Sequence, residues 1–233
     1  MRQHLTYGGI DSRLFGVYIS GNGVIDSPAR AYNEIVIPGR NGVLLGSEKR
    51  LEALELTYPA FIIHDILENA RRFKAALYSK TGFQTLVDTY YPDEFRMAVF
   101  RAGLEVETAP AIRGGFFDLI FQCRPERFLF QGLVPLRDYE VILNPTDYEA
   151  KPIIRIFGTG TLTINDISIT ITDADEYTDI DCEMMEAYKG DYSRNAFIEL
   201  SGNDFPSLVK GRNYISKTGN ITSYTITPRW WVL

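Results

Sequence analysis

The chain has 233 residues, a formal net charge of −6 and 23% charged residues. This length suits one large domain or two of ordinary size, and the charged fraction is typical of a globular protein rather than a disordered one. An acidic balance argues against a sequence-independent grip on nucleic acid, which requires clustered Lys and Arg.

Cysteine content and hydropathy narrow the class further. The two cysteines, Cys123 and Cys182, are too few to stabilise a chain of this size through disulfide bonds. The two histidines do not complete a four-ligand zinc site with them. We therefore expect two small buried or half-buried thiols in a reducing compartment. No apolar run approaches the roughly 20 residues of a membrane span, and the first ten residues lack the apolar stretch of a signal peptide. We expect synthesis in the cytoplasm and no membrane insertion.

Short strands are predicted through most of the first half. Apolar runs at 35–37 and 43–45 flank a turn-rich cluster, which predicts a hairpin because Gly and Asn tolerate positive φ. The cluster consists of Pro38, Gly39, Arg40, Asn41 and Gly42. Alternation of apolar and polar residues predicts further strands within 53–58, 95–99 and 117–123.

One segment has a helical period instead. Apolar residues recur every three or four positions between Ile63 and Leu77, which predicts an amphipathic helix at about residues 65–79. Asp65 is expected to cap its start, with Glu68 three residues later, and Gly82 lies just past its end. No other segment predicts a helix as clearly.

The second half is predicted to be β again. Residues 161–172 alternate Leu or Ile with Thr or Ser around an Asn165–Asp166 turn, and another strand is expected within 221–226. Gly132 and Pro135 follow a strongly apolar segment, so we place a domain boundary there. The predicted domains are 1–132 and 133–233.

The two predicted domains differ in charge. Residues 1–132 carry 15 basic and 15 acidic side chains, whereas 133–233 carry 9 and 15. The first domain also has 12 Arg to 3 Lys. Arg is enriched over Lys where protein surfaces meet, because its planar, weakly hydrated fork makes several oriented hydrogen bonds. This composition indicates that the first domain is an assembly module.

Most candidate segments for catalysis or cofactor binding do not match the residue patterns of known motifs. Gly158–Thr163 begins like a dinucleotide loop, but Thr163 replaces the third glycine and a β-run follows, so we expect a turn between strands. His4 lies near the terminus and His64 near the start of the predicted helix, where we expect a solvated side chain rather than a catalytic base. No cofactor is implied.

An acidic run between Asp173 and Glu186 invites a calcium hypothesis. In the register of an EF-hand loop, Thr178 takes the place of the required Gly and Met184 that of the bidentate Glu, so the match fails. We expect a solvated acidic loop. An irregular calcium site and a patch for a basic partner remain open as alternatives.

Trp230 and Trp231 follow Arg229 close to the end of the chain. Exposed Trp can stack on sugars, so a carbohydrate-binding module is one hypothesis. The other hypothesis, which we favour, is that one Trp enters the core while the second packs with Arg229.

An ordered set of fragments resembles the distal tail proteins, the tail-tip hubs of non-contractile-tailed phages that infect Gram-positive bacteria. None of these fragments is catalytic, and their order spans nearly the whole chain. They are residues 37–42, 91–95, 121–125, 151–158, 180–183, 187–190, 205–206, 211–213 and 228–231.

The resemblance implies a mainly β protein of two domains. The first would be a β-barrel-like, tail-tube-like domain with one helix that forms a hexameric ring, and the second a galectin-like β-sandwich at the ring's periphery. The implied role is a structural hub in the virion that joins the tail tube to the host-adsorption apparatus. DNA would pass through its channel without specific binding.

The implied partners are further copies of the chain in one ring or two stacked rings, the tail-tube protein, a tail-associated or fibre protein, and receptor-binding or baseplate proteins. A head-to-tail ring needs two different complementary surfaces on each subunit. The turn Pro38–Gly42 is a candidate ring contact. A carbohydrate-binding module remains the alternative function, and a glycosidase using two carboxylates of the acidic half is a third hypothesis.

Overall fold

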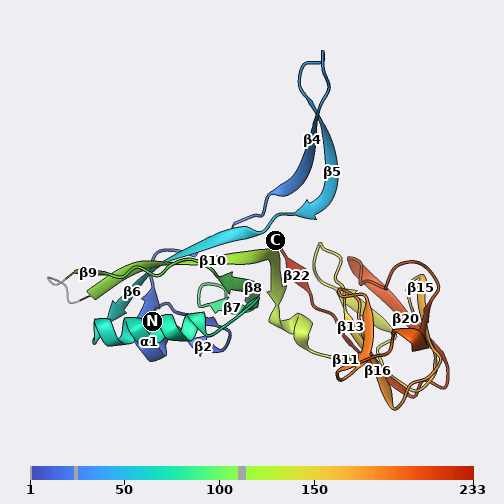
Figure 1. The fold of residues 1–233 in the computed structure, drawn as a ribbon. Helices are drawn as coiled ribbons and strands as arrows, with labels where there is room; N and C mark the ends of the chain where they lie inside the picture. Colours follow the sequence, from blue (N-terminus) through green and yellow to red (C-terminus); the bar gives the residue numbers. More distant parts are fainter. Residues whose placement is uncertain (1, 24–25, 110–113) are drawn as a thin grey trace. The chain divides into compact units, whose positions relative to one another are not determined.

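The computed structural model describes residues 2–23, 26–109 and 114–233. Strands make up most of the secondary structure, α1 (Ile66–Tyr78) is the α-helix of this described part, and three short 3-10 helices lie at Ser12–Phe15, Phe130–Leu133 and Asn195–Phe197. The chain divides into two compact units, Met1–Arg127 with Leu233, and Phe128–Val232. The predicted mainly β fold class is confirmed (Figure 1).

A curled antiparallel sheet forms the body of the first unit. Its strands follow the order β2-β1-β7-β8-β10-β6-β3, and β9 also pairs with β10. The strand bounds are β1 (Leu5–Tyr7), β2 (Ile10–Asp11), β3 (Val17–Ile19), β6 (Leu54–Ile63), β7 (Gln84–Asp88), β8 (Glu94–Phe100), β9 (Glu107–Ala109) and β10 (Gly114–Leu129). A separate two-stranded sheet consists of β4 (Arg30–Val36) and β5 (Val43–Leu51).

Helix α1 covers one face of this curled sheet. Phe73 and Leu77 are buried from the helix side, and they join a core that includes Tyr7 and Phe121. The rings of Tyr7 and Phe121 pack with their centroids 5.1 Å apart. The alternation along β10 buries Phe117, Leu119, Phe121 and Cys123 on this side. The helix bounds match the periodicity of the sequence.

The expected cap at the helix start is wrong. Asp65 has φ 40° and makes no side-chain capping hydrogen bond, and His64 before it has φ 60°. A capping residue normally has extended backbone angles, which aim its side chain at the first free N–H groups. The left-handed conformation at Asp65 aims it elsewhere, because the chain must turn sharply from β6 into the helix.

The second unit is a sandwich of two antiparallel sheets. One sheet has the order β11-β21-β13-β16-β17-β18 and the other β12-β20-β14-β15-β19. The bounds are β11 (Leu136–Arg137), β12 (Val141–Asn144), β13 (Ile153–Phe157), β14 (Gly160–Ile164), β15 (Ile167–Ile171), β16 (Tyr177–Asp181), β17 (Glu186–Lys189), β18 (Tyr192–Ser193), β19 (Ile198–Leu200), β20 (Gly211–Gly219) and β21 (Ser223–Thr227). The short β22 (Trp231–Val232) follows them in the chain and belongs to neither sandwich sheet.

The core of the sandwich is built from alternating Ile and Leu of both sheets, among them Ile154, Leu162 and Ile180. The predicted Asn165–Asp166 hairpin is confirmed, with Ile164 opposite Ile167. On its other face, hydroxyl pairs bridge the strands at 2.9 Å between Thr161 and Thr170. The alternation of Ile with Thr in the sequence therefore separates the core side from the polar side.

Candidate functional site

The hairpin of β4 and β5, which we call the arm, is the most unusual surface of the first unit. Its strands pair in register, with Ile35 opposite Leu44 and Val36 opposite Val43. Successive residues of a strand point to opposite faces. Because Ile35 and Val36 are 54% and 72% exposed, and Leu44 and Leu45 are also exposed, both faces of the arm present apolar side chains to solvent.

Pro38–Gly42 form the tip of the arm, so the predicted hairpin is confirmed. Gly39 and Gly42 have φ angles of 81° and 84°, in the left-handed region that glycine adopts without strain. The N–H of Arg40 donates to the carbonyl of Ile37 at 3.1 Å and closes the turn. A contact between this tip and a neighbouring subunit stays a prediction.

Neither strand of the arm pairs with a further strand within the described residues, so the arm is a two-stranded sheet with two outer edges. An isolated two-stranded hairpin is marginally stable in water, and exposed edges readily pair with another chain. Apolar faces and free edges together are the properties of a segment that packs against a partner. The sequence predicted the two apolar strands of the arm. It did not predict that both faces of the hairpin are exposed to solvent.

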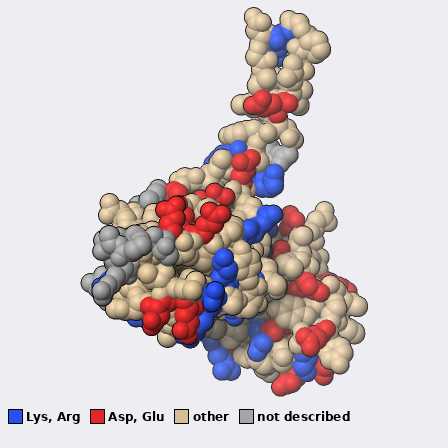
Figure 2. Space-filling model, turned by 60° about the vertical axis from the view of Figure 1, so that its left-hand side comes forward, with Lys and Arg blue, Asp and Glu red and all other residues tan. Residues whose placement is uncertain are grey.

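A second surface of the first unit is the face of β6 and β10 opposite α1, which we call the open face. The register places Glu55 opposite Gln122 and Pro59 opposite Asp118 on this side. Glu105, Glu107 and Asp118 line a groove here with Phe116, which is 43% exposed. Acidic side chains gather in patches on the forward face of this unit in Figure 2. Two cations also contact this side, since Arg101 donates to Gln122 at 2.6 Å and Arg2 lies over the Tyr18 ring. The open face thus carries four acidic and two basic side chains beside its apolar patches.

Two buried ion pairs lie at the end of the curled sheet where the chain leads into the arm. Arg96 Nη2 lies 2.6 Å from Asp26 Oδ1, and Arg127 Nη2 pairs with Glu94. The Arg127 guanidinium also stacks over the Tyr91 ring, 4.7 Å from its centroid. Sequence reasoning missed both pairs, because nothing in the spacing of these residues brings them together.

The acidic run of the second unit is not the solvated loop that we expected. Part of it forms β16, where Asp179 and Asp181 are buried. Arg155 donates two hydrogen bonds to Asp179, at 2.6 and 2.7 Å, and Arg229 donates two to Asp181, at 3.0 and 2.8 Å. The pairing of β13 with β16 places Arg155 opposite Asp179, whereas Arg229 reaches Asp181 from the segment that follows β21.

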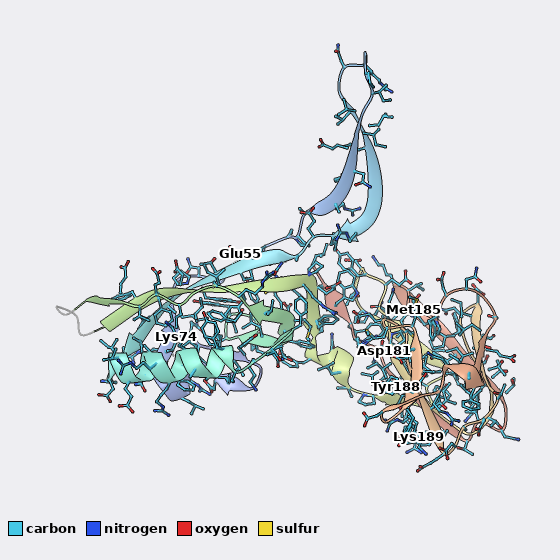
Figure 3. The ribbon with its side chains drawn as sticks, in the orientation of Figure 1. Glu55, Lys74, Asp181, Met185, Tyr188 and Lys189 are labelled. Atoms are coloured by element: carbon cyan, nitrogen blue, oxygen red, sulfur yellow. The ribbon has the colours of Figure 1, made fainter. Side chains whose placement is uncertain are left out.

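The pKa of Asp181 falls below its usual value. Burial acts to raise it, but the hydrogen bonds from Arg229 and from the backbone N–H groups of Met184 and Glu183 outweigh this effect. Asp181 lies on β16 beside the paired strand β17, on which Figure 3 labels Tyr188 and Lys189. Among the described residues, no group of three or more His, Cys, Asp or Glu side chains is arranged to hold a metal ion.

The two tryptophans have structural contacts. Trp230 is 5% exposed and belongs to the sandwich core, as one of our hypotheses held. The expectation that the second Trp packs with Arg229 is wrong. Trp231 instead stacks on Tyr148 with centroids 4.4 Å apart, and its Nε1–H donates to the carbonyl of Glu149 at 2.9 Å. Its ring face is therefore already covered on one side, which weakens the carbohydrate hypothesis.

The remaining candidate residues also have structural settings. Gly158 lies in the link between β13 and β14, so the expected turn is confirmed. Both cysteines are buried and unpaired, and burial raises the pKa of each thiol to about 12. His4 lies near the terminus, where its backbone N–H donates to Thr89 Oγ1 at 3.0 Å. No helix of the described part is long and apolar enough to cross a membrane.

Comparison with known proteins finds likeness in structure rather than in sequence. Neither a protein-family model nor a curated protein matches the chain. A crystal structure of the Dit protein of phage SPP1, described as a paradigm of the hub adsorption apparatus in phages infecting Gram-positive bacteria, aligns with a TM-score of 0.71 at 14% identity. The alignment covers 97% of this chain and 98% of that chain.

Baseplate structures of phage P2 in the activated conformation, with calcium and with strontium, contain chains that align with a TM-score of 0.53 at 10% identity. Each alignment covers 97% of both chains. These neighbours are structural components of phage hubs and baseplates. The described chain thus has the two-part β fold of the SPP1 Dit protein along nearly its whole length.

Proposed function

We propose that the chain is the structural hub of a phage tail tip, and that it forms a hexameric ring joining the tail tube to the baseplate. The observation that carries this proposal is the likeness of fold to the SPP1 Dit protein over 97% of the chain. A chance likeness in one domain would not extend across both units. The proposal makes the protein a virion component without enzymatic activity.

The ring is built by the first unit in this proposal, and the arm is its subunit contact. An arm with apolar faces and two free edges supplies one half of a head-to-tail interface, and the neighbour supplies the other. Pairing of the arm edges with another subunit would satisfy their backbone groups. The second unit lies at the ring's periphery, with baseplate or receptor-binding proteins as its partners.

The open face is the surface that we assign to the DNA channel. A wall rich in Lys and Arg would hold DNA by releasing its counterions, whereas an acidic wall repels the phosphates and lets the DNA pass. Four acidic side chains on the open face outnumber Arg2 and Arg101, which also contact it, and α1 covers the opposite face of the sheet. The four are Glu55, Glu105, Glu107 and Asp118. Reversal of Glu107 and Asp118 to Lys in an assembled phage should slow DNA ejection at low salt, and unchanged ejection at every ionic strength would refute this assignment.

Ring formation is tested with the full chain by light scattering and negative-stain microscopy. Val36→Glu places a charge on the arm, whereas Leu14→Glu places one at an equally exposed site of the same unit, since both residues are 72% exposed. We expect rings of six subunits from the parent and Leu14→Glu, and loss of rings in Val36→Glu. Rings that survive Val36→Glu would refute the arm contact, and monomers of the parent even with the tail-tube protein present would refute the hub.

A further inference from the structure

The segment that leads into the arm is held against the body of the first unit by a small set of contacts. The Tyr90 hydroxyl donates to the carbonyl of Gly21 at 3.0 Å, and the Ser20 N–H donates to the carbonyl of Pro59 at 2.7 Å. Gly23 lies so close to Tyr90 that a Cβ added there would be 2.9 Å from the Tyr90 Cβ. Asp26 follows, four residues before β4 begins.

Asp26 reaches a cation that is otherwise deeply buried. Arg96 is 8% exposed, and its Nη2 donates to Asp26 Oδ1 at 2.6 Å. Within the described part of the chain, Arg96 Nη1 has no hydrogen-bond partner and Asp26 is the carboxylate paired with this guanidinium. A buried arginine is strongly unfavourable without a counterion, so the charge balance of the core depends on a residue of the arm's leading segment.

The other acidic side chains around this site are already engaged. Asp26, Arg96, Asp88 and Glu94 line the same cavity of about 70 Å³. The Asp88 carboxylate accepts the Tyr58 hydroxyl and the backbone N–H groups of residues 90 and 91, and Glu94 pairs with Arg127. Neither acid is free to replace Asp26 without losing these bonds.

The two ends of the arm are therefore held differently. β5 ends at Leu51 and β6 begins at Leu54, so the outgoing strand passes after two residues into a strand that is paired with β10. The incoming strand β4 begins at Arg30, eleven residues after β3 ends at Ile19. It pairs with β5 from Arg30 opposite Leu51 onward, and the N–H of Glu52 donates to the carbonyl of Ala29 at 2.8 Å. Among the described residues between β3 and β4, those whose contacts hold the chain to the body of the unit are Ser20, Gly21, Gly23 and Asp26.

We propose that Asp26 is a positioning residue that latches the leading segment of the arm to the buried Arg96 and so fixes the direction in which the arm is presented. Loss of the latch leaves the arm attached mainly through β5, and free to swing. The consequence for ring assembly rests on the proposed function, whereas the latch itself does not. An arm of fixed direction meets its neighbour with less loss of conformational entropy on association.

The latch is tested by pulsed electron spin resonance, with spin labels at Asn41→Cys on the arm tip and Lys74→Cys on α1. Figure 3 labels Lys74 on the helix, and the native thiols are buried and do not compete for the label. Labelled chain is diluted with unlabelled chain, so that distances within one subunit are measured. The parent should give a narrow distance distribution and Asp26→Asn one at least twice as wide.

A matched control comes from the neighbouring ion pair. The Glu94 and Arg127 side chains are 23% and 8% exposed, close to the 24% and 10% of Asp26 and Arg96, but neither belongs to the leading segment. Glu94→Gln should lower the melting temperature as Asp26→Asn does and leave the distribution narrow. A broad distribution in Glu94→Gln would mean that general destabilisation moves the arm, and would overturn the latch.

A double variant separates the latch from stability. Asp26→Asn with Arg96→Met removes both charges, so the melting temperature should recover toward that of the parent while the distribution stays broad. A narrow distribution in this variant would overturn the proposal, because the arm would then keep its direction without the pair. If the parent forms rings, the double variant should form them at least tenfold less readily. If the parent forms none even with the tail-tube protein present, the hub proposal fails, and the distances still decide the latch.

Discussion

Replacing Asp181 by Asn should destabilise the second unit by about 3 kcal/mol, the low end of the range for breaking a buried ion pair. Asn keeps an oxygen for the backbone N–H groups but loses the charge that faces Arg229. The Arg229 and Asp181 side chains are 14% and 12% exposed, so the stranded guanidinium is poorly hydrated. The low end applies because Glu183 lies 3.6 Å from Arg229 and remains as a second carboxylate.

Tryptophan fluorescence during urea unfolding measures this loss directly, because both tryptophans, Trp230 and Trp231, lie in the second unit. For a unit of this size, about 3 kcal/mol corresponds to a fall in melting temperature of about 12 °C or more. Asp179→Asn is the matched control, because it leaves behind Arg155, whose side chain is 45% exposed and can be hydrated. We expect a loss of about 1 kcal/mol there. Equal losses in the two variants would refute the argument from the exposure of the remaining cation.

The pH dependence of the same variant gives a second check. Because the folded-state pKa of Asp181 lies below its ordinary value of 3.8, its contribution to stability is present above that ordinary value and is lost as pH falls through the folded-state pKa. The difference in unfolding free energy between the parent and Asp181→Asn should therefore be constant near neutral pH and shrink below about pH 4. A difference that grows on acidification would contradict this assignment.

Three further predictions concern packing. Gly132→Ala should lower the free energy of unfolding by about 3 kcal/mol or more, because its Cβ would lie 2.3 Å from the backbone nitrogen of Trp230. Gly202→Ala, whose Cβ would have nothing within 4 Å, should leave the free energy of urea unfolding unchanged. Trp231→Ala should cost about 1 to 2 kcal/mol through loss of the Tyr148 stack, and glycan-array binding lost without this destabilisation would instead favour a sugar site. Both native thiols, with pKa values of about 12, should resist a disulfide reagent at pH 8 until the chain is unfolded; rapid reaction of the folded protein would contradict their burial.

Local patterns in the sequence were sufficient to predict the helix and two of the hairpins. The three- and four-residue spacing up to Leu77 predicted α1, and the Gly-rich tip at 38–42 and the Asn165–Asp166 turn predicted two hairpins. These predictions succeeded because periodicity and turn chemistry act between residues close together in the chain. The same patterns could not say whether the arm is covered, because burial depends on what lies above a strand.

Tertiary structure alone decided the state of the charged residues. We expected a solvated loop for the acidic run near Asp181, but the fold places Asp181 beside Arg229, 48 residues away. Asp26 and Arg96 meet across 70 residues in the same way. A sequence records how many charges a chain has, and the net charge of −6 was evident from the start. Which of those charges are buried, paired or left on an open face follows from contacts that no local spacing encodes, because electrostatic energy depends on distance and burial in the folded chain.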